Sequence, residues 1–105
     1  LFTPHLLPVA RGILSTITVP VTHHDEDALA VYREAFANEP FRHVSEKPPA
    51  LRDVVHRNTV RVYAQRVADV RQPTLQVIAA IDNLQKGAAG QALQNANVML
   101  GLDET

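Results

Sequence analysis

The segment that decides the fold of this chain is Ile81-Asp82-Asn83-Leu84-Gln85-Lys86-Gly87-Ala88-Ala89-Gly90-Gln91-Ala92-Leu93-Gln94-Asn95-Ala96-Asn97. The largely apolar residues that precede it, Leu75–Ile81, include several β-branched side chains and predict a buried strand. Asp82 and Asn83 end this strand, because both side chains readily bond to nearby backbone in turns. After Lys86 the apolar residues recur about every 3.6 positions, which predicts a helix.

The first turn of the expected helix contains Gly87 and Gly90, although glycine has low helix propensity. Two glycines there lower helix stability, so we expect another backbone or a ligand to approach this turn closely. A helix N-terminus without bulky side chains also offers open backbone N–H groups to an anion or polar ligand. The apolar face of the expected helix consists of Ala89, Leu93, Ala96 and Leu100.

The first third of the chain predicts a turn, a strand and a helix. Val9–Gly12 forms the turn, in which Gly12 is free to take a positive φ. Apolar residues then alternate over Ile13–Val21, and this pattern predicts a strand with one buried face. Thr22 and Asp25 resemble a capping box, which predicts a helix from there to about Phe36.

The middle of the chain gives weaker signals. Residues 41–57 predict a long surface loop with a short strand near Phe41–Val44. A further strand is expected from Val60 to Val67, with a bulge near Arg66 where the alternation slips. Taken together, these elements predict an α+β fold, in which a mostly antiparallel sheet carries two helices on one face.

Length and composition restrict the class of protein. The 105 residues are enough for one modest core, so we expect one domain or part of one. A net charge of −1 without a basic block argues against a nucleic-acid partner. No apolar run approaches the length of a membrane span, and no signal-peptide pattern is present. The absence of cysteine excludes a disulfide framework and a thiol nucleophile in this chain, and agrees with a cytoplasmic location.

Three blocks of the sequence occur in the order and at about the spacing found in one enzyme family. They are Phe2–Leu14, Asp82–Asn97 and Gly101–Thr105. These blocks closely resemble the C-terminal part of N-acetyl-γ-glutamyl-phosphate reductase, a family of arginine biosynthesis. The resemblance spans essentially the whole chain. It implies that residues 1–105 are the last third of such a reductase, within the substrate and dimerisation domain of a glyceraldehyde-3-phosphate-dehydrogenase-like fold. It also implies that residues 82–101 return toward a nucleotide domain outside this chain.

The resemblance implies an activity for the full-length protein. Members of the family reduce an acyl phosphate to a semialdehyde with NADPH as cofactor, and we expect a homo-oligomer. The family's cysteine, catalytic histidine and glycine-rich nucleotide loop all precede the region present here, so this chain holds no catalytic residue and should be inactive alone. Two alternatives are the homologous aminoadipyl-phosphate reductase of lysine biosynthesis and a non-catalytic α+β interaction module.

The resemblance also suggests site residues. Asn83 occupies the place of an asparagine that holds the nicotinamide carboxamide in related dehydrogenases, although an Asx-turn that closes the strand is an equal alternative. Gly87 and Gly90 either let the helix approach the cofactor or serve close helix packing. His5 and Arg11 are candidates for substrate binding, with a structural histidine and a solvated arginine as alternatives.

Other polar residues are weaker candidates. His56-Arg57-Asn58 stands where the family has Gly-Ser-Asn or Gly-Thr-Asn, and this departure makes the local backbone less permissive. Lys86 could contact a phosphate, but a solvated lysine is the default. His23 and His24 beside acidic residues could bind a metal, but adjacent residues point in different directions, so we predict a capping segment and no metal site.

Overall fold

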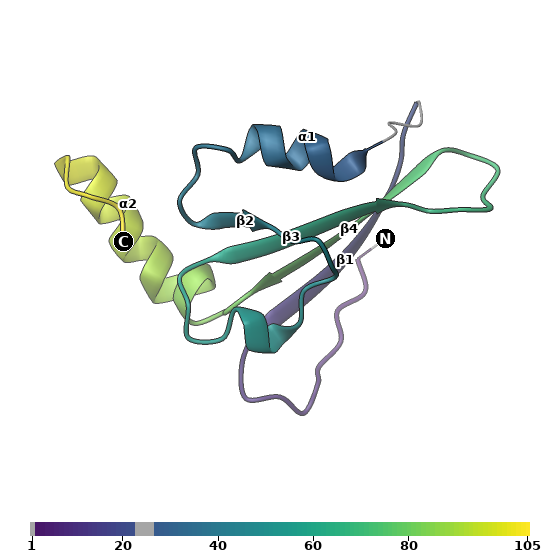
Figure 1. Cartoon of the computed structure of the whole chain (residues 1–105). Helices are drawn as coiled ribbons and strands as arrows, with labels where there is room; N and C mark the ends of the chain where they lie inside the picture. Colours follow the sequence, from purple (N-terminus) through teal and green to yellow (C-terminus); the bar gives the residue numbers. More distant parts are fainter. Residues whose placement is uncertain (1, 23–26) are drawn as a thin grey trace.

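A four-stranded sheet in the order β1-β4-β3-β2 forms the centre of the structure (Figure 1). The structure is a computed structural model that describes residues 2–22 and 27–105. Along the chain its elements are β1 (Ile13–Pro20), α1 (Ala28–Ala35), β2 (Arg42–Val44), the 3₁₀ turn η1 (Leu51–Asp53), β3 (Val60–Arg66), β4 (Thr74–Ile81), the π-helical turn η2 (Gln85–Ala89) and α2 (Gly90–Leu100).

The sheet is mixed. β4 pairs antiparallel with both β1 and β3, whereas β2 pairs parallel with β3. The predicted α+β class is therefore confirmed, and the antiparallel expectation holds for two of the three pairings. β2 runs parallel to β3 because their connection passes through η1 instead of a tight hairpin, and parallel neighbours need such a crossover.

The pairing of β3 with β4 is regular from Val60 opposite Ile81 to Arg66 opposite Leu75. The bulge predicted near Arg66 is therefore wrong. Val67 lies just beyond the strand, where its backbone N–H donates to the carbonyl of Thr74 at 2.9 Å. The change of phase in the sequence marks the end of the strand and not an inserted residue.

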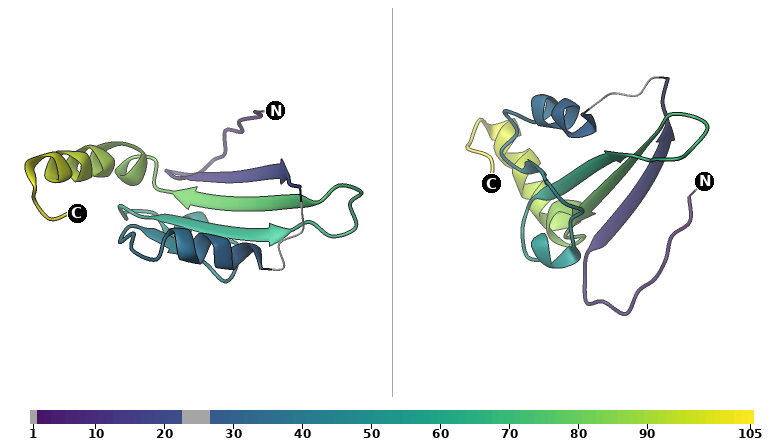
Figure 2. Two further views of the ribbon diagram at one scale, coloured as in Figure 1. Left: turned by 90° about the horizontal axis from the view of Figure 1, so that it is seen from above. Right: turned by 45° about the vertical axis from the view of Figure 1, so that its right-hand side comes forward.

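Helix α1 covers one face of the sheet and forms the main core with it (Figures 1 and 2). Leu29, Tyr32 and Phe36 pack against this core, as the sequence predicted for that helix face. On the sheet side the buried members are Val62, Ala64 and Val77. Removing these side chains from water supplies the main stabilisation of this layer.

The start of α1 differs from the prediction. Asp27 is the N-cap residue, and its Oδ1 accepts the backbone N–H groups of Leu29 and Ala30 at 3.0 and 3.1 Å. The described helix therefore begins at Ala28 and not at Thr22, because Asp27 is itself a strong capping residue directly before the apolar repeat. The proposed partner of Thr22, Asp25, lies outside the described residues. The helix ends at Ala35 with Phe36 as C-cap, as predicted.

Strand β1 lies at the edge of the sheet, and the buried face predicted for it is wrong within this chain. Ile13, Ile17 and Val19 are between 40% and 48% exposed. Only β4 pairs with β1, and α1 lies over β3 and β2 instead. Both the outer edge and the apolar side chains of β1 are therefore available for contacts with other protein segments.

Helix α2 extends beyond the end of the sheet and does not cover its face (Figure 2). The expectation of two helices on one face is thus confirmed for α1 and wrong for α2. The predicted apolar face of α2 points outward, since Leu93 is 57% and Leu100 is 73% exposed. Its inward side is polar and bonds to neighbouring segments through Gln94 and Asn97.

The connection between β2 and β3 is more ordered than the predicted surface loop. η1 interrupts it, and the side chain of Val54 directly after η1 is fully buried. Asp53 accepts the backbone N–H of Ala50 at 2.8 Å and so caps this short turn. Among the described residues, no helix is long and apolar enough to cross a membrane.

Candidate functional site

Asp82 is the centre of a buried polar cluster at the end of β4. Its side chain is fully buried and accepts four hydrogen bonds. Oδ1 accepts from Arg11 Nη2 at 2.8 Å and from the backbone N–H groups of Leu84 and Gln85 at 2.8 and 3.1 Å. Oδ2 accepts the backbone N–H of His56 at 2.6 Å. One carboxylate thus fixes the turn before β1, the loop before β3 and the start of η2.

The electrostatics of the cluster keep Asp82 ionised. Burial by itself raises the pKa of a carboxyl, because it penalises the charged form. Here the Arg11 guanidinium and the three backbone donors outweigh burial and hold the pKa of Asp82 well below its usual range. A buried carboxylate is stable only with such compensation, so the cluster depends on every one of its donors.

Arg11 has an internal partner that the sequence did not reveal. Its side chain is 19% exposed and forms the ion pair with Asp82. Nη1 lies 3.3 Å from His56 Nδ1, and Nε is buried without a hydrogen-bond partner among the described residues. The predicted role of Arg11 in substrate binding stays a prediction, because Asp82 occupies only part of its donor set.

Asn83 joins the end of β4 to the turn before β1. Its Oδ1 accepts the backbone N–H of Gly12 at 2.6 Å, and Gly12 has the positive φ of 112° that the sequence predicted. The Asx-turn belongs to Asp82, which accepts the N–H of Leu84 two residues on. The Nδ2 of Asn83 has no hydrogen-bond partner within residues 2–22 and 27–105. The role of Asn83 toward a nicotinamide carboxamide stays a prediction, in which only Nδ2 is left to act because Oδ1 already accepts from Gly12.

The helical turn after Asn83 is wider than an α-helical one. The backbone N–H of Gly87 donates to the carbonyl of Asp82 at 3.0 Å, and that of Ala89 donates to the carbonyl of Leu84 at 3.2 Å. Both bonds span five residues, as in a π-helix, and such single turns recur at functional sites. The helical conformation thus begins at Gln85, two residues earlier than predicted.

Comparison with known proteins places this cluster in a family context. The family described as semialdehyde dehydrogenase, dimerisation domain, matches residues 1–83. The chain belongs to this family. Relatives named N-acetyl-gamma-glutamyl-phosphate reductase include those of Dehalococcoides mccartyi, Salinispora tropica and Leptospira interrogans, which are 48%, 47% and 44% identical to it.

The resemblance predicted from the sequence is thereby confirmed. The three alignments cover 99% or 100% of this chain but only 30% or 31% of each relative. The dimerisation-domain chain thus spans about a third of the length of the relatives that it matches.

Packing explains the glycine at position 90. A Cβ at this position would overlap the side chain of Asn58. Asn58 Nδ2 donates to the carbonyls of Gly90 and Thr105 at 3.3 and 2.7 Å and so ties α2 to the loop before β3. A Cβ on Gly87 would lie 3.4 Å from Ile81 Cδ1, and Gly87 itself is exposed. A cofactor role for either glycine stays a prediction.

His56 occupies a left-handed backbone conformation with a φ of 64°. A glycine is favoured in this conformation, in agreement with the Gly-Ser-Asn or Gly-Thr-Asn that the resemblance led us to expect at this place. The histidine keeps the N–H bond to Asp82 despite the strain. The hydrogen bond to Asp82 thus holds His56 in a backbone conformation that a non-glycine residue normally avoids.

Lys86 is not the solvated lysine expected as default. It is half-buried, donates to Gln94 Oε1 at 2.6 Å, and has its Nζ 5.4 Å from the centre of the Phe41 ring. Desolvation, with a contribution from the nearby positive charge of Arg42, lowers the pKa of Lys86. Its contacts thus tie η2 to α2 and to the segment before β2.

The remaining candidates lie away from the cluster or outside the description. His5 is exposed in the extended N-terminal segment, where Nδ1 lies 3.1 Å from the carbonyl of Thr3. His23 and His24 lie outside the described residues. Among residues 2–22 and 27–105, no group of three His, Asp or Glu side chains is placed to hold a metal ion. Sequence reasoning missed Asp82 as a site residue. Two features could have indicated it: Asp82 directly follows a buried strand, and a residue of opposite charge, Arg11, lies in another of the blocks that carry the resemblance.

Proposed function

We propose that the full-length protein carrying this chain is an NADPH-dependent reductase that converts N-acetyl-γ-glutamyl phosphate to the semialdehyde. The observation that carries the proposal is the Asp82 cluster, which brings together the two sequence blocks that resemble the reductase family. Arg11 comes from one block and Asp82 with Asn83 from the other. The names of the relatives support the substrate, and their family supports a nicotinamide cofactor.

Each residue of the cluster has a proposed task. Arg11 presents its remaining guanidinium donors to an anionic group of the substrate, while Asp82 holds the guanidinium in place. Asn83 donates through Nδ2 to the nicotinamide carboxamide, and the Gly12 bond fixes the orientation of its amide. The exposed Gly87 leaves room for the cofactor. Gly90 allows the side chain of Asn58 to pack against the same turn. Outside the cluster, His5 contacts the substrate from the N-terminal segment. The cofactor itself supplies the hydride.

The exposed apolar surfaces fit a larger assembly. We assign the uncovered side chains of β1 to contacts within a homo-oligomer, which agrees with the dimerisation-domain family. We assign the outward apolar face of α2 to a nucleotide domain encoded outside this chain. The proposed partners are the small-molecule acyl phosphate and further copies of the protein, and the proposed location is the cytoplasm.

The nucleophile of this reaction must come from outside the chain, because the 105 residues contain no cysteine. The proposed thiolate attacks the acyl carbon and expels phosphate, and the thioester then accepts the hydride. The homologous aminoadipyl-phosphate substrate is longer by one methylene, a difference that a pocket distinguishes by only about 1–3 kcal/mol. The relatives named above carry the glutamyl name, which favours the shorter substrate.

The test is the oxidation of NADPH by the purified full-length protein. Turnover is expected with N-acetyl-γ-glutamyl phosphate and should exceed that with the aminoadipyl analogue. Arg11→Lys keeps the charge but not the planar fork, so kcat/KM should fall while the protein remains folded. The isolated 105-residue chain should show no turnover. Failure of the full-length protein with both acyl phosphates would refute the proposal.

A further inference from the structure

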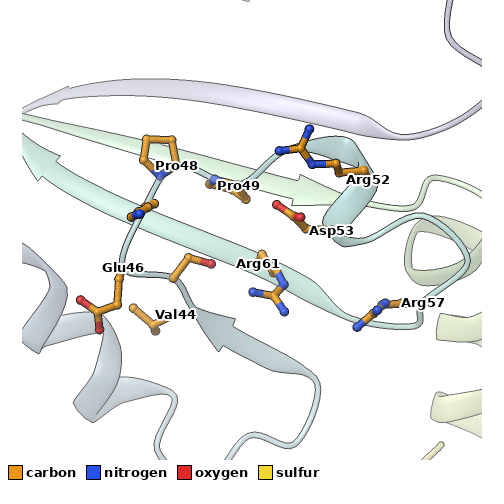
Figure 3. Close-up of a pocket in the computed structure, with 10 residues that line it drawn as sticks. Val44, Glu46, Pro48, Pro49, Arg52, Asp53, Arg57 and Arg61 are labelled. Atoms are coloured by element: carbon orange, nitrogen blue, oxygen red, sulfur yellow. The ribbon is translucent and has the colours of Figure 1, made fainter.

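A hollow of about 500 Å³ lies between the segment after β2, η1 and strand β3 (Figure 3). Its volume is within the range of about 300–1,000 Å³ that is typical of small-molecule sites. Arg11, Asp82 and Asn83 do not line it, so it is separate from the cluster at the end of β4. Its polar character comes from the side chains of Ser45, Glu46, Lys47, Arg52, Asp53, Arg57 and Arg61.

Positive charge dominates this hollow. Four of its side chains are cationic and two are anionic, which leaves a formal surplus of two positive charges. Both carboxylates already have partners, because Glu46 pairs with Arg33 at 2.6 Å and Asp53 accepts the N–H of Ala50 at 2.8 Å. Within residues 2–22 and 27–105, none of the four cations is within ion-pair distance of a carboxylate.

Two buried donors of the hollow lack partners. Arg61 Nε and Ser45 Oγ are inaccessible and form no hydrogen bond to any described residue. Ser45 lies beside strand β3, since its backbone N–H donates to the carbonyl of Val62, the residue after Arg61, at 2.8 Å. Buried polar atoms without a partner are costly, so the wall of the hollow carries unsatisfied donors directly behind its unpaired cations.

We propose that this hollow binds a small molecule that carries phosphate groups. Three arginines supply planar donor forks of the kind that match phosphate oxygens, and the ammonium group of Lys47 adds further donors. Figure 3 shows Arg57 and Arg61 approaching the hollow from the loop before β3 and from β3 itself, whereas Arg52 comes from η1. A site of this size with several separate cations suits a ligand with more than one negative charge.

The experiment measures the binding of inorganic pyrophosphate to the full-length protein by isothermal titration calorimetry. Saturable binding to the hollow is expected when the proposed nucleotide site is already filled with NADP⁺. Arg57→Gln should weaken it by about tenfold or more, because it removes a charge-assisted contact. Arg52→Gln should act in the same direction. Both residues are exposed, so these variants should fold, and a melting curve checks this for each protein.

The matched control is Arg71→Gln, which makes the same charge change in the exposed turn between β3 and β4. This change should alter the pyrophosphate affinity by no more than about twofold. Arg71 does not line the hollow, and salt screens the effect of charges that lie outside a site. A wild-type protein without saturable binding would overturn the proposal, as would an equal loss of affinity in the Arg71 variant. Citrate binding as tightly as pyrophosphate would overturn the assignment to phosphate.

Discussion

Replacing Asp82 by Asn tests the central cluster, because the change keeps the shape of the side chain and turns one of its two acceptor oxygens into a donor NH₂ group. All four partners of Asp82 are donors. The amide of an asparagine presents an acceptor to only one side, so its NH₂ group must face either the N–H of His56 or the three donors at the other oxygen. The partly buried Arg11 guanidinium also loses its counter-charge.

The expected loss of stability is large for the replacement of one carboxylate oxygen by an NH₂ group. Breaking a buried ion pair costs about 3–5 kcal/mol, and the partial exposure of Arg11 places this case near the lower end. A loss of about 3 kcal/mol increases local opening by roughly a hundredfold, at about 1.4 kcal/mol for each factor of ten. The backbone amides of His56, Leu84 and Gln85 should therefore lose most of their protection from hydrogen exchange.

Hydrogen exchange followed by mass spectrometry on the full-length protein measures this directly. Peptides that cover residues 54–58 and 82–87 should exchange faster in Asp82→Asn, while peptides from α1 stay unchanged. Asp103→Asn is a matched control, since Asp103 is exposed and forms no hydrogen bond among the described residues. Unchanged exchange around residues 56 and 84 would refute the central role of Asp82.

The stabilisation that Asp82 provides should decrease in acid, and the same exchange measurement can follow this decrease. Because the folded-state pKa of Asp82 lies below that of the unfolded chain, its stabilising contribution is complete above about pH 4 and is lost as the pH falls toward the folded value. The difference between the wild type and Asp82→Asn should thus be constant near neutral pH and shrink in acid. A difference that grows below pH 4 would contradict the depressed pKa.

Other predictions separate packing roles from catalytic ones. His56→Gly should be more stable than His56→Ala by about 1 kcal/mol, because it relieves a left-handed conformation, and thermal melts compare the two. Gly90→Ala should lower the melting temperature through its clash with Asn58, and the loss should shrink when Asn58→Ala is added; equal losses in both backgrounds would disprove that contact. Asn83→Ala should reduce hydride transfer by on the order of a hundredfold if the nicotinamide is misplaced, whereas a lower melting temperature with unchanged kcat and cofactor KM would leave it a structural residue. The isolated 105-residue chain should self-associate because β1 exposes an edge and apolar side chains, and a compact monomer in size-exclusion chromatography would contradict this.

Much of the local structure follows from patterns in the sequence. The strands at Ile13, Val60 and Thr74 begin within a residue of the predicted positions, because alternation and β-branched side chains act over short distances. The turn at Gly12 was predicted as well, and its positive φ uses the freedom that glycine has there. The left-handed conformation at position 56 was not predicted, because this chain has a histidine there and no glycine marks the position.

The sequence by itself therefore determined the main strands and helices, the α+β class and the family resemblance. Only the tertiary structure decided that Asp82 is the centre of the site, because its four donors come from three segments and Arg11 lies 71 positions away. It also decided which apolar faces are covered. The apolar patterns of β1 and α2 favour burial, yet both faces are exposed within this chain, because a pattern cannot say whether a covering surface belongs to the same chain. The spacing of apolar residues indicates which side of a strand or helix is apolar, whereas long-range contacts decide which surface packs against that side.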